Sequence, residues 1–155
     1  MRDKDSVIRS IFNKHGEQAI YITNTGYLSR DIYDIYPDNE NIFYMQGSMG
    51  LSPAIALGMS FGETDRDIVC FVGDASLLMH LGITHTIRDS GHQNIHVYVI
   101  DNGMHESVGM YHCSPLEKEY PGVTEIFKVK RGQKRPRVGI GFKENATAIR
   151  STLSE

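Results

Sequence analysis

The sequence contains no tryptophan and only two cysteines in 155 residues. Cys70 and Cys113 do not form a CxxC pair, which argues against a disulfide framework and against a cysteine-based zinc site. No run of about 18 apolar residues occurs, so the sequence predicts no membrane-spanning helix. Residues 1–4 do not look like the start of a signal peptide. Together these absences predict a cytoplasmic protein with reduced thiols and no membrane partner.

A strong net charge is absent as well. The formal net charge is −3, and the one concentrated basic run spans residues 128–137. This balance argues against nucleic acid as a partner, and we expect the basic run to be a solvated loop. Hydrophobic residues make up 40% of the chain and charged residues 23%, which is ordinary for a globular domain. We therefore expect a single domain over residues 1–155.

The segment from residue 67 to residue 109 organises the rest of the chain. Ile68 to Val72 is a continuous apolar run, which predicts a strand buried on both faces of a parallel sheet. Gly73 allows a tight turn, and Asp74 stands where the strand ends. A second buried strand is expected from Ile95 to Ile100. Between the two strands we expect one helix capped by Ser76, with apolar positions at helical spacing: Leu77, Leu78, Leu81 and Ile87.

The flanking segments predict alternating helices and strands. Helices are expected over Ser6–His15, Ser29–Tyr36, Ser52–Gly62 and Lys143–Leu153, and strands over Gln18–Thr23, Asn41–Met45 and Glu125–Lys130. This order is typical of an α/β fold, here a doubly wound, mostly parallel sheet with helices on both faces.

Two of the predicted strands deliver oxygen-bearing side chains to their carboxyl ends. Asp74 follows the first, and Asn102 follows the second. In open α/β sheets ligands bind at this edge. A carboxylate and an amide oxygen suit Mg²⁺, and the backbone amides of Ala75 and Ser76 suit phosphate oxygens. Since a carboxylate alone would repel a diphosphate, the sequence predicts a Mg²⁺-diphosphate site.

These residues resemble the fingerprint of thiamine diphosphate enzymes, which runs from Gly-Asp-Gly to Asn-Asn. This chain has Gly73-Asp74-Ala75 and Asp101-Asn102. It departs from the fingerprint at Ala75, where alanine resists a positive φ, and at Asp101. The resemblance implies a thiamine diphosphate-binding fold. It also implies Mg²⁺ ligands from the side chains of Asp74 and Asn102 and from the carbonyl of Met104, and cofactor contacts at Gly73, Asp74, Ala75, Ser76, Asn102 and Met104.

A second motif, Gly47-Ser48-Met49-Gly50, would read as a glycine-rich turn with a core methionine if it stood alone. Beside the metal fingerprint, it is similar to the Gly-Ser-Met-Gly segment of decarboxylases that act on phosphonopyruvate and sulfopyruvate. The resemblance implies that Gly47, Ser48 and Met49 contact the cofactor. The Gly47 carbonyl would accept a hydrogen bond from the aminopyrimidine, and Met49 would hold the cofactor bent.

A third motif, Gly103 to Gly109, resembles the Gly-Ala-His-Asp-Ser-Val-Gly segment of phosphonopyruvate decarboxylases, although residues 110–113 depart from that pattern. The resemblance adds Ser107 to the predicted cofactor contacts. His105 stands at the mouth of the predicted site, where proton transfer or substrate contact competes with a structural role. The other histidines are expected at the surface or at helix boundaries: His15, His80, His85, His92, His96 and His112.

In this family the glutamate that activates the cofactor belongs to a separate pyrimidine-binding domain. The resemblance therefore implies a β-type subunit that works with an α-type partner in a hetero-oligomer, α2β2 or larger. Among small anionic 2-oxo acids it favours 3-phosphonopyruvate, which would give phosphonoacetaldehyde and CO₂, with sulfopyruvate second. Two alternatives stay open: an acetolactate-type carboligase and a non-catalytic nucleotide-binding scaffold. No GxGxxG follows a predicted strand and no GxxxxGK[ST] occurs, which counts against NAD and ATP.

Overall fold

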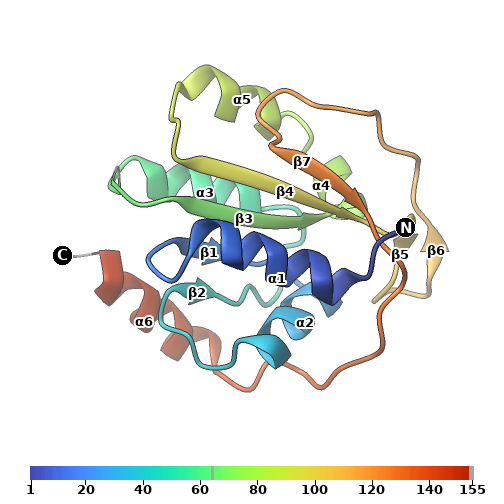
Figure 1. Ribbon diagram of the computed structural model, residues 1–155, viewed down its shortest axis with the longest axis horizontal. Coiled ribbons are helices and arrows are strands. Elements are labelled where there is room, and N and C mark those ends of the chain that lie inside the picture. Colours follow the sequence, from blue (N-terminus) through green and yellow to red (C-terminus); the bar gives the residue numbers. More distant parts are fainter. Residues whose placement is uncertain (64, 154–155) are drawn as a thin grey trace.

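The computed structural model describes residues 1–63 and 65–153, which form one parallel sheet covered by helices (Figure 1). The sheet has five strands in the order β2-β1-β3-β4-β7, and every neighbouring pair is parallel. The strands are β1 (Ile20–Ile22), β2 (Ile42–Phe43), β3 (Ile68–Gly73), β4 (Ile95–Asp101) and β7 (Glu125–Lys128).

The central strand β3 is buried on both faces, as its continuous apolar run predicts. Ile68, Cys70 and Val72 point into one apolar core, whereas Val69 and Phe71 point into the other. Alternate side chains of a strand face opposite sides of a sheet, so a strand covered on both faces must be apolar at every position.

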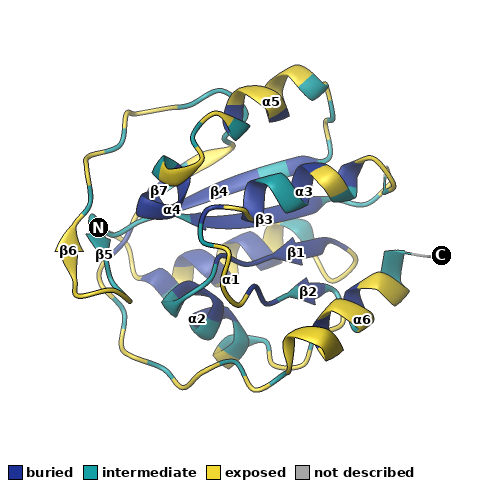
Figure 2. Cartoon of the chain, turned by 180° about the vertical axis from the view of Figure 1, so that it is seen from behind, coloured by how far each residue is buried: buried dark blue, intermediate teal, exposed yellow. Residues whose placement is uncertain are grey.

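Helices cover both faces of the sheet. α1 (Lys4–His15) and α2 (Tyr27–Ile35) pack on one face, which is the near side in Figure 1. The other face, seen from behind in Figure 2, carries α3 (Ser52–Ser60), α4 (Asp74–Met79), α5 (Ile83–Ser90) and α6 (Phe142–Leu153). The predicted doubly wound α/β class is confirmed. Among the described residues, no helix is long and apolar enough to cross a membrane.

The prediction of a single helix between the two central strands is wrong. The segment forms α4 and α5, and Ser76 lies inside α4, whose N-cap is Gly73. His80 leaves helical geometry at φ −137° and ψ 43°, and Gly82, a weak helix former, precedes α5.

Residues 130–137 form the largely exposed loop that the composition predicts, but the basic run is not solvated throughout. Lys128 ends β7, and Val129 is buried. Arg135 forms ion pairs with Asp5, Asp31 and Asp34. The sequence also did not reveal a small antiparallel hairpin made of β5 (Met104–His105) and β6 (Tyr111–His112). The ion pairs of Arg135 join segments far apart in the chain, whereas the hairpin is a local pairing of very short strands.

A buried histidine fastens the end of α1 to the amino edge of the sheet. His15 Nδ1 lies 2.7 Å from an Asp67 oxygen, and its Nε2 lies 2.8 Å from the Tyr98 hydroxyl. His96 contacts the other Asp67 oxygen at 3.1 Å. His15 is thus a helix-boundary residue, as predicted, but its side chain is only 3% exposed. Since both ring nitrogens have partners, hydrogen bonding accounts for this cluster.

This cluster predicts a loss of stability in mild acid. Burial lowers the pKa of His15. Burial opposes ionisation of Asp67 too, but the hydrogen bonds from His15 and His96 outweigh it and leave that pKa lowered. The unfolded chain therefore binds more protons than the folded chain, and for His15 the loss of stability begins as pH falls below about 6.5.

We expect His15→Gln to flatten the decline of the unfolding free energy between about pH 6.5 and pH 5, measured by denaturant titration. Exposed His112 serves as the control: His112→Gln should keep the decline, and an unchanged slope in His15→Gln would contradict the assignment.

Candidate functional site

The candidate site lies at the carboxyl edge of the sheet, where β3 and β4 end next to each other. Gly73 pairs with Ile100 in the last register step of these strands. Gly73 is extended, with φ −78° and ψ 156°, and Ala75 lies inside α4. Neither residue has a positive φ. The departure from the fingerprint at Ala75 therefore places no strain on this turn.

Asp74 presents a buried carboxylate at this edge. The residue is 4% exposed, and one of its oxygens accepts a hydrogen bond from the Gly103 amide at 2.8 Å. Burial raises the pKa of Asp74, and the nearby carboxylate of Asp101 raises it further. None of the ion pairs among the described residues includes Asp74. A buried carboxylate without a basic partner is costly unless a cation binds to it.

Asn102 lies beside Asp74, and its amide is held at both ends. Its oxygen accepts a hydrogen bond from the Met104 amide at 3.0 Å, and its Nδ2 donates to Glu106 at 3.0 Å. The amide oxygen keeps a second lone pair for another partner. The edge thus offers one carboxylate, one oriented amide oxygen and the carbonyls of the loop after β4.

Most of the predicted site residues border a single cavity here. Those that line it are Met49, Gly73, Asp74, Ala75, Ser76, Asn102, Met104, His105 and Ser107. Two predicted residues do not line it: Ser48 is exposed with φ 52°, and Gly47 borders a neighbouring hollow. Thr25 borders both spaces, and its hydroxyl accepts a hydrogen bond from the Gly47 amide at 2.8 Å. The three sequence motifs therefore meet at one place in the fold.

The residues at this edge fit a magnesium ion and a diphosphate. Asp74, Asn102 and the Met104 carbonyl would supply three oxygen ligands, which is the donor type that Mg²⁺ prefers. The unpaired Asp74 carboxylate is the observation that favours a cation. Asn24 provides a second observation that favours a bound group. Its Nδ2 donates a hydrogen bond to the Ser76 hydroxyl at 2.9 Å, while its buried Oδ1 has no hydrogen-bond partner among the described residues.

Comparison with known families agrees with this geometry. The model of the family described as thiamine pyrophosphate enzyme, C-terminal TPP binding domain, matches residues 23–136. The chain belongs to this family. The match includes all of the described cavity-lining residues except Lys4. The resemblance read from Gly73-Asp74 and Asn102 is thereby confirmed.

Curated relatives of this TPP-binding domain include two kinds of decarboxylase. The chain is 39% identical over 103 residues to the sulfopyruvate decarboxylase subunit beta of Methanocaldococcus jannaschii, which covers 66% of this chain and 54% of that protein. It thus spans about half the length of that relative. It is 27% identical over 149 residues to the same subunit from Methanococcus maripaludis, covering 96% of this chain and 76% of the relative. It is 37% identical over 91 residues to the phosphonopyruvate decarboxylase of Streptomyces viridochromogenes, and this match covers 59% of this chain and 22% of the relative.

Among solved structures, the domain resembles a protein from Mycobacterium smegmatis described as a thiamin diphosphate-dependent enzyme. The TM-score is 0.62 at 19% identity, and the match covers 75% of this chain and 24% of that chain. This likeness supports the fold.

Sequence reasoning missed several residues that border the cavity. Asn24 and Thr25 follow β1 just as Asp74 follows β3, so a polar residue after the first predicted strand was an available signal. Glu106 lies within the third motif but was given no role. Lys4 carries no sequence signal, because it comes from the first turn of α1 and reaches the site only through the tertiary fold.

His105 lies beside the cavity, where its motif predicts it. A role for it in proton transfer or substrate contact stays a prediction. It is half-buried in β5 and borders the cavity. Its backbone carbonyl accepts hydrogen bonds from the amides of Val108 and Met110, each at 3.1 Å. These bonds close the loop between β5 and β6 beside the cavity mouth.

The loop of the second motif packs tightly on α4. A side chain at Gly50 would place its Cβ 2.7 Å from the Ser76 carbonyl oxygen and 2.6 Å from the His80 ring. Gly50 also has φ 88°. Both constraints require glycine at this position. This contact holds the segment that carries Met49 against the helix that begins at Asp74.

We predict opposite effects for two glycine substitutions. Gly50→Ala should lower the unfolding free energy by about 1–3 kcal/mol, because it combines backbone strain with a clash against a carbonyl. The matched control is Gly58→Ala in α3, where a Cβ meets nothing within 4 Å. That change should raise the unfolding free energy by about 0.5–1 kcal/mol. Denaturant unfolding of both variants tests this, and similar effects of the two changes would refute it.

Proposed function

We propose that this chain binds thiamine diphosphate with Mg²⁺ and forms the diphosphate-binding half of a 2-oxo acid decarboxylase. The observation that carries the proposal is the buried, unpaired carboxylate of Asp74 beside the amide oxygen of Asn102, at the edge where the family fingerprint expects both. Family membership supports the cofactor, and the names of the curated relatives support the reaction class.

The proposal gives a role to most of the predicted site residues. Asp74, Asn102 and the Met104 carbonyl would hold Mg²⁺, and the metal would hold the diphosphate. The backbone amides of Ala75 and Ser76 and the hydroxyl of Ser107 would contact the phosphate oxygens. Gly47 and Met49 would orient the pyrimidine. When bound, the cofactor supplies the nucleophilic carbon that adds to a 2-oxo acid and the ring that accepts the electron pair as CO₂ leaves.

A partner chain carrying a pyrimidine-binding domain would complete the site. Two carboxylates line the cavity in the described part of the chain, those of Asp74 and Glu106. The proposal assigns Asp74 to the metal, and Glu106 is paired with Lys4 and Asn102, so neither would protonate a pyrimidine nitrogen. Apolar side chains stand exposed on the loop that borders the cavity, with Val108 62% exposed and Tyr111 73% exposed. These observations support a partner that covers this loop, in a hetero-oligomer that we propose to be α2β2 or larger.

The substrate we propose is a short 2-oxo acid with an acidic tail. The third motif favours 3-phosphonopyruvate. The relatives that share the greater part of this chain are named for sulfopyruvate, which makes that acid the stronger candidate of the two. Both acids place a tetrahedral anion next to the oxo acid, so one site would accept either shape.

Replacing Asp74 tests the cofactor proposal directly. Asp74→Asn should leave the cofactor-free chain at least as stable as wild type, because it removes a desolvated charge without a partner. The same change should abolish the rise in melting temperature that thiamine diphosphate and Mg²⁺ produce together. Asp89→Asn, at an exposed site on α5, is the control and should keep the full rise. A wild-type chain that thiamine diphosphate and Mg²⁺ fail to stabilise would refute the proposal.

Reconstitution tests the reaction. We expect the isolated chain to be inactive and to decarboxylate sulfopyruvate, phosphonopyruvate or both once the partner is added. His105→Gln should lower kcat by about 10²-fold or more if this histidine transfers a proton, and should change KM mainly if it contacts substrate. Full turnover without a partner would contradict the split-subunit proposal. Inertness to both acids, with C–C bond formation from pyruvate, would favour the carboligase alternative.

A further inference from the structure

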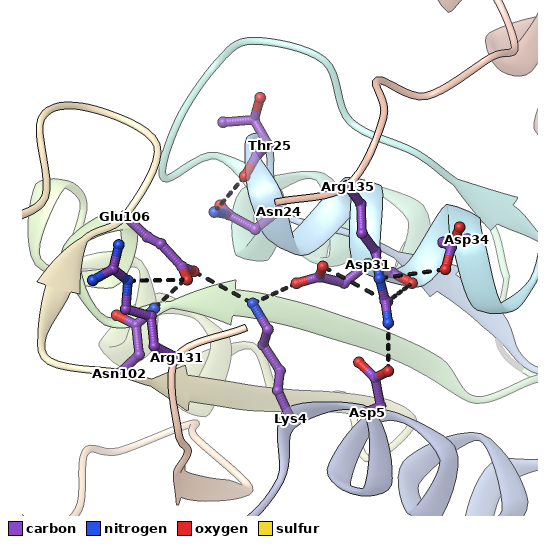
Figure 3. Close-up of polar contacts among 10 residues, drawn as sticks. All are labelled: Lys4, Asp5, Asn24, Thr25, Asp31, Asp34, Asn102, Glu106, Arg131 and Arg135. Carbon is purple, nitrogen blue, oxygen red and sulfur yellow. Dashed lines mark hydrogen bonds and ion pairs between the residues drawn. The ribbon is translucent and has the colours of Figure 1, made fainter. Parts of the chain in front are cut away.

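A chain of buried polar contacts runs from the first turn of α1 to Asn102 (Figure 3). Lys4 Nζ lies between the carboxylates of Asp31 and Glu106, 3.3 Å from a Glu106 oxygen. That same Glu106 oxygen accepts a hydrogen bond from Asn102 Nδ2 at 3.0 Å. The guanidinium of Arg131 lies 4.0 Å from the other Glu106 oxygen. One carboxylate thus joins two cations to a predicted metal ligand.

We propose that Glu106 is a positioning residue for Asn102: it fixes the side-chain amide so that the oxygen, and not the NH₂ group, faces the metal. Lys4 and Arg131 hold the Glu106 carboxylate in place for this task. The inference deepens the proposed function and rests on it, since it concerns how this chain prepares its own metal ligand.

The hydrogen bonds of Asn102 allow only one orientation of its amide. The oxygen accepts from the Met104 amide, and the NH₂ group donates to Glu106. A flipped amide would turn its NH₂ group toward the Met104 N–H and its oxygen toward the Glu106 carboxylate. Both new pairs would be repulsive. A carboxylate is an acceptor only, so Glu106 selects the NH₂ end of Asn102 unambiguously.

Burial makes Glu106 dependent on its cations. Its side chain is 8% exposed, and that of Lys4 is 5% exposed. A carboxylate in such surroundings is strongly disfavoured if its basic partner is removed. The 131–135 segment lies directly over Lys4: a Cβ at Gly132 would come within 2.7 Å of Lys4 Nζ. The ammonium is thus enclosed between α1, α2 and this segment.

The same network contains a branch that serves as an internal control. Arg135 pairs with Asp5, Asp31 and Asp34, which hold α1, α2 and the 131–135 segment together. None of these residues contacts Asn102 in Figure 3. Both branches contain ion pairs that join α1 to other parts of the chain, but only the Glu106 branch touches a predicted metal ligand. Substitutions in either branch should therefore lower stability, but only a substitution in the Glu106 branch should lower metal affinity.

The experiment compares Glu106→Ala with Arg135→Met in the full chain. Calorimetric titration with thiamine diphosphate, repeated over a series of Mg²⁺ concentrations, gives the Mg²⁺ concentration for half-maximal binding. We expect Glu106→Ala to raise this concentration by about 10- to 100-fold, the usual cost of losing a partner of a metal ligand. Arg135→Met should change it by less than about twofold, because its branch contacts no ligand, while still lowering the melting temperature.

A second background removes the choice of amide orientation. In Asn102→Asp both terminal atoms are oxygens, so Glu106 can no longer select one end and faces a like charge instead. Adding Glu106→Ala to Asn102→Asp relieves that repulsion, so we expect no further loss of Mg²⁺ affinity, which makes the double-mutant cycle strongly non-additive.

The possible results separate the inference from the function on which it rests. Equal losses from Glu106→Ala in both backgrounds, or an equal loss from Arg135→Met, would show that Glu106 acts only through stability and would overturn the inference. If the wild-type chain binds thiamine diphosphate and Glu106→Ala needs the same Mg²⁺ concentration for half-maximal binding, the inference is overturned and the proposed function stands. A wild-type chain that binds no thiamine diphosphate at any Mg²⁺ concentration would overturn the proposed function and the inference together.

Discussion

The candidate site is built around one electrostatic constraint: the Asp74 carboxylate is buried at the carboxyl edge of the sheet without a basic partner among the described residues. Such a group is tolerated when something else compensates its charge. The surrounding residues supply the amide oxygen of Asn102 and backbone carbonyl oxygens, which are the ligand type that suits a hard cation. The chemistry of the site follows from this arrangement.

The sheet makes that arrangement possible. Because β3 and β4 are parallel and in register to their last residues, the groups that follow them emerge side by side. The two apolar cores pack against the strands from both faces and so fix the position of this edge. Departures from the family fingerprint at Ala75 and Asp101 are accommodated here, since Ala75 continues α4 and Asp101 shares the Gly103 amide with Asp74.

The ion-pair network connects this edge to two segments that are far apart in the chain. Lys4 and Asp5 come from the start of the chain, and Arg131 and Arg135 from the segment that follows β7. Segments about 100 residues apart in the sequence therefore meet beside Glu106. Polar groups buried in this way contribute to a specific geometry more than to overall stability, and a metal ligand requires such a specific geometry.

The fold class, the central strands and the positions of Asp74 and Asn102 could be predicted from the amino-acid sequence, because strand periodicity and the polar residues after each strand are local signals. The cofactor expectation came from the resemblance of three short motifs to one family. The break after Asp74 at His80, the position of Ser48 outside the cavity and the approach of Lys4 to it appear only in the folded chain. Those features depend on which distant side chains meet, such as Gly50 against α4 and Lys4 against Glu106, and no local pattern encodes such contacts.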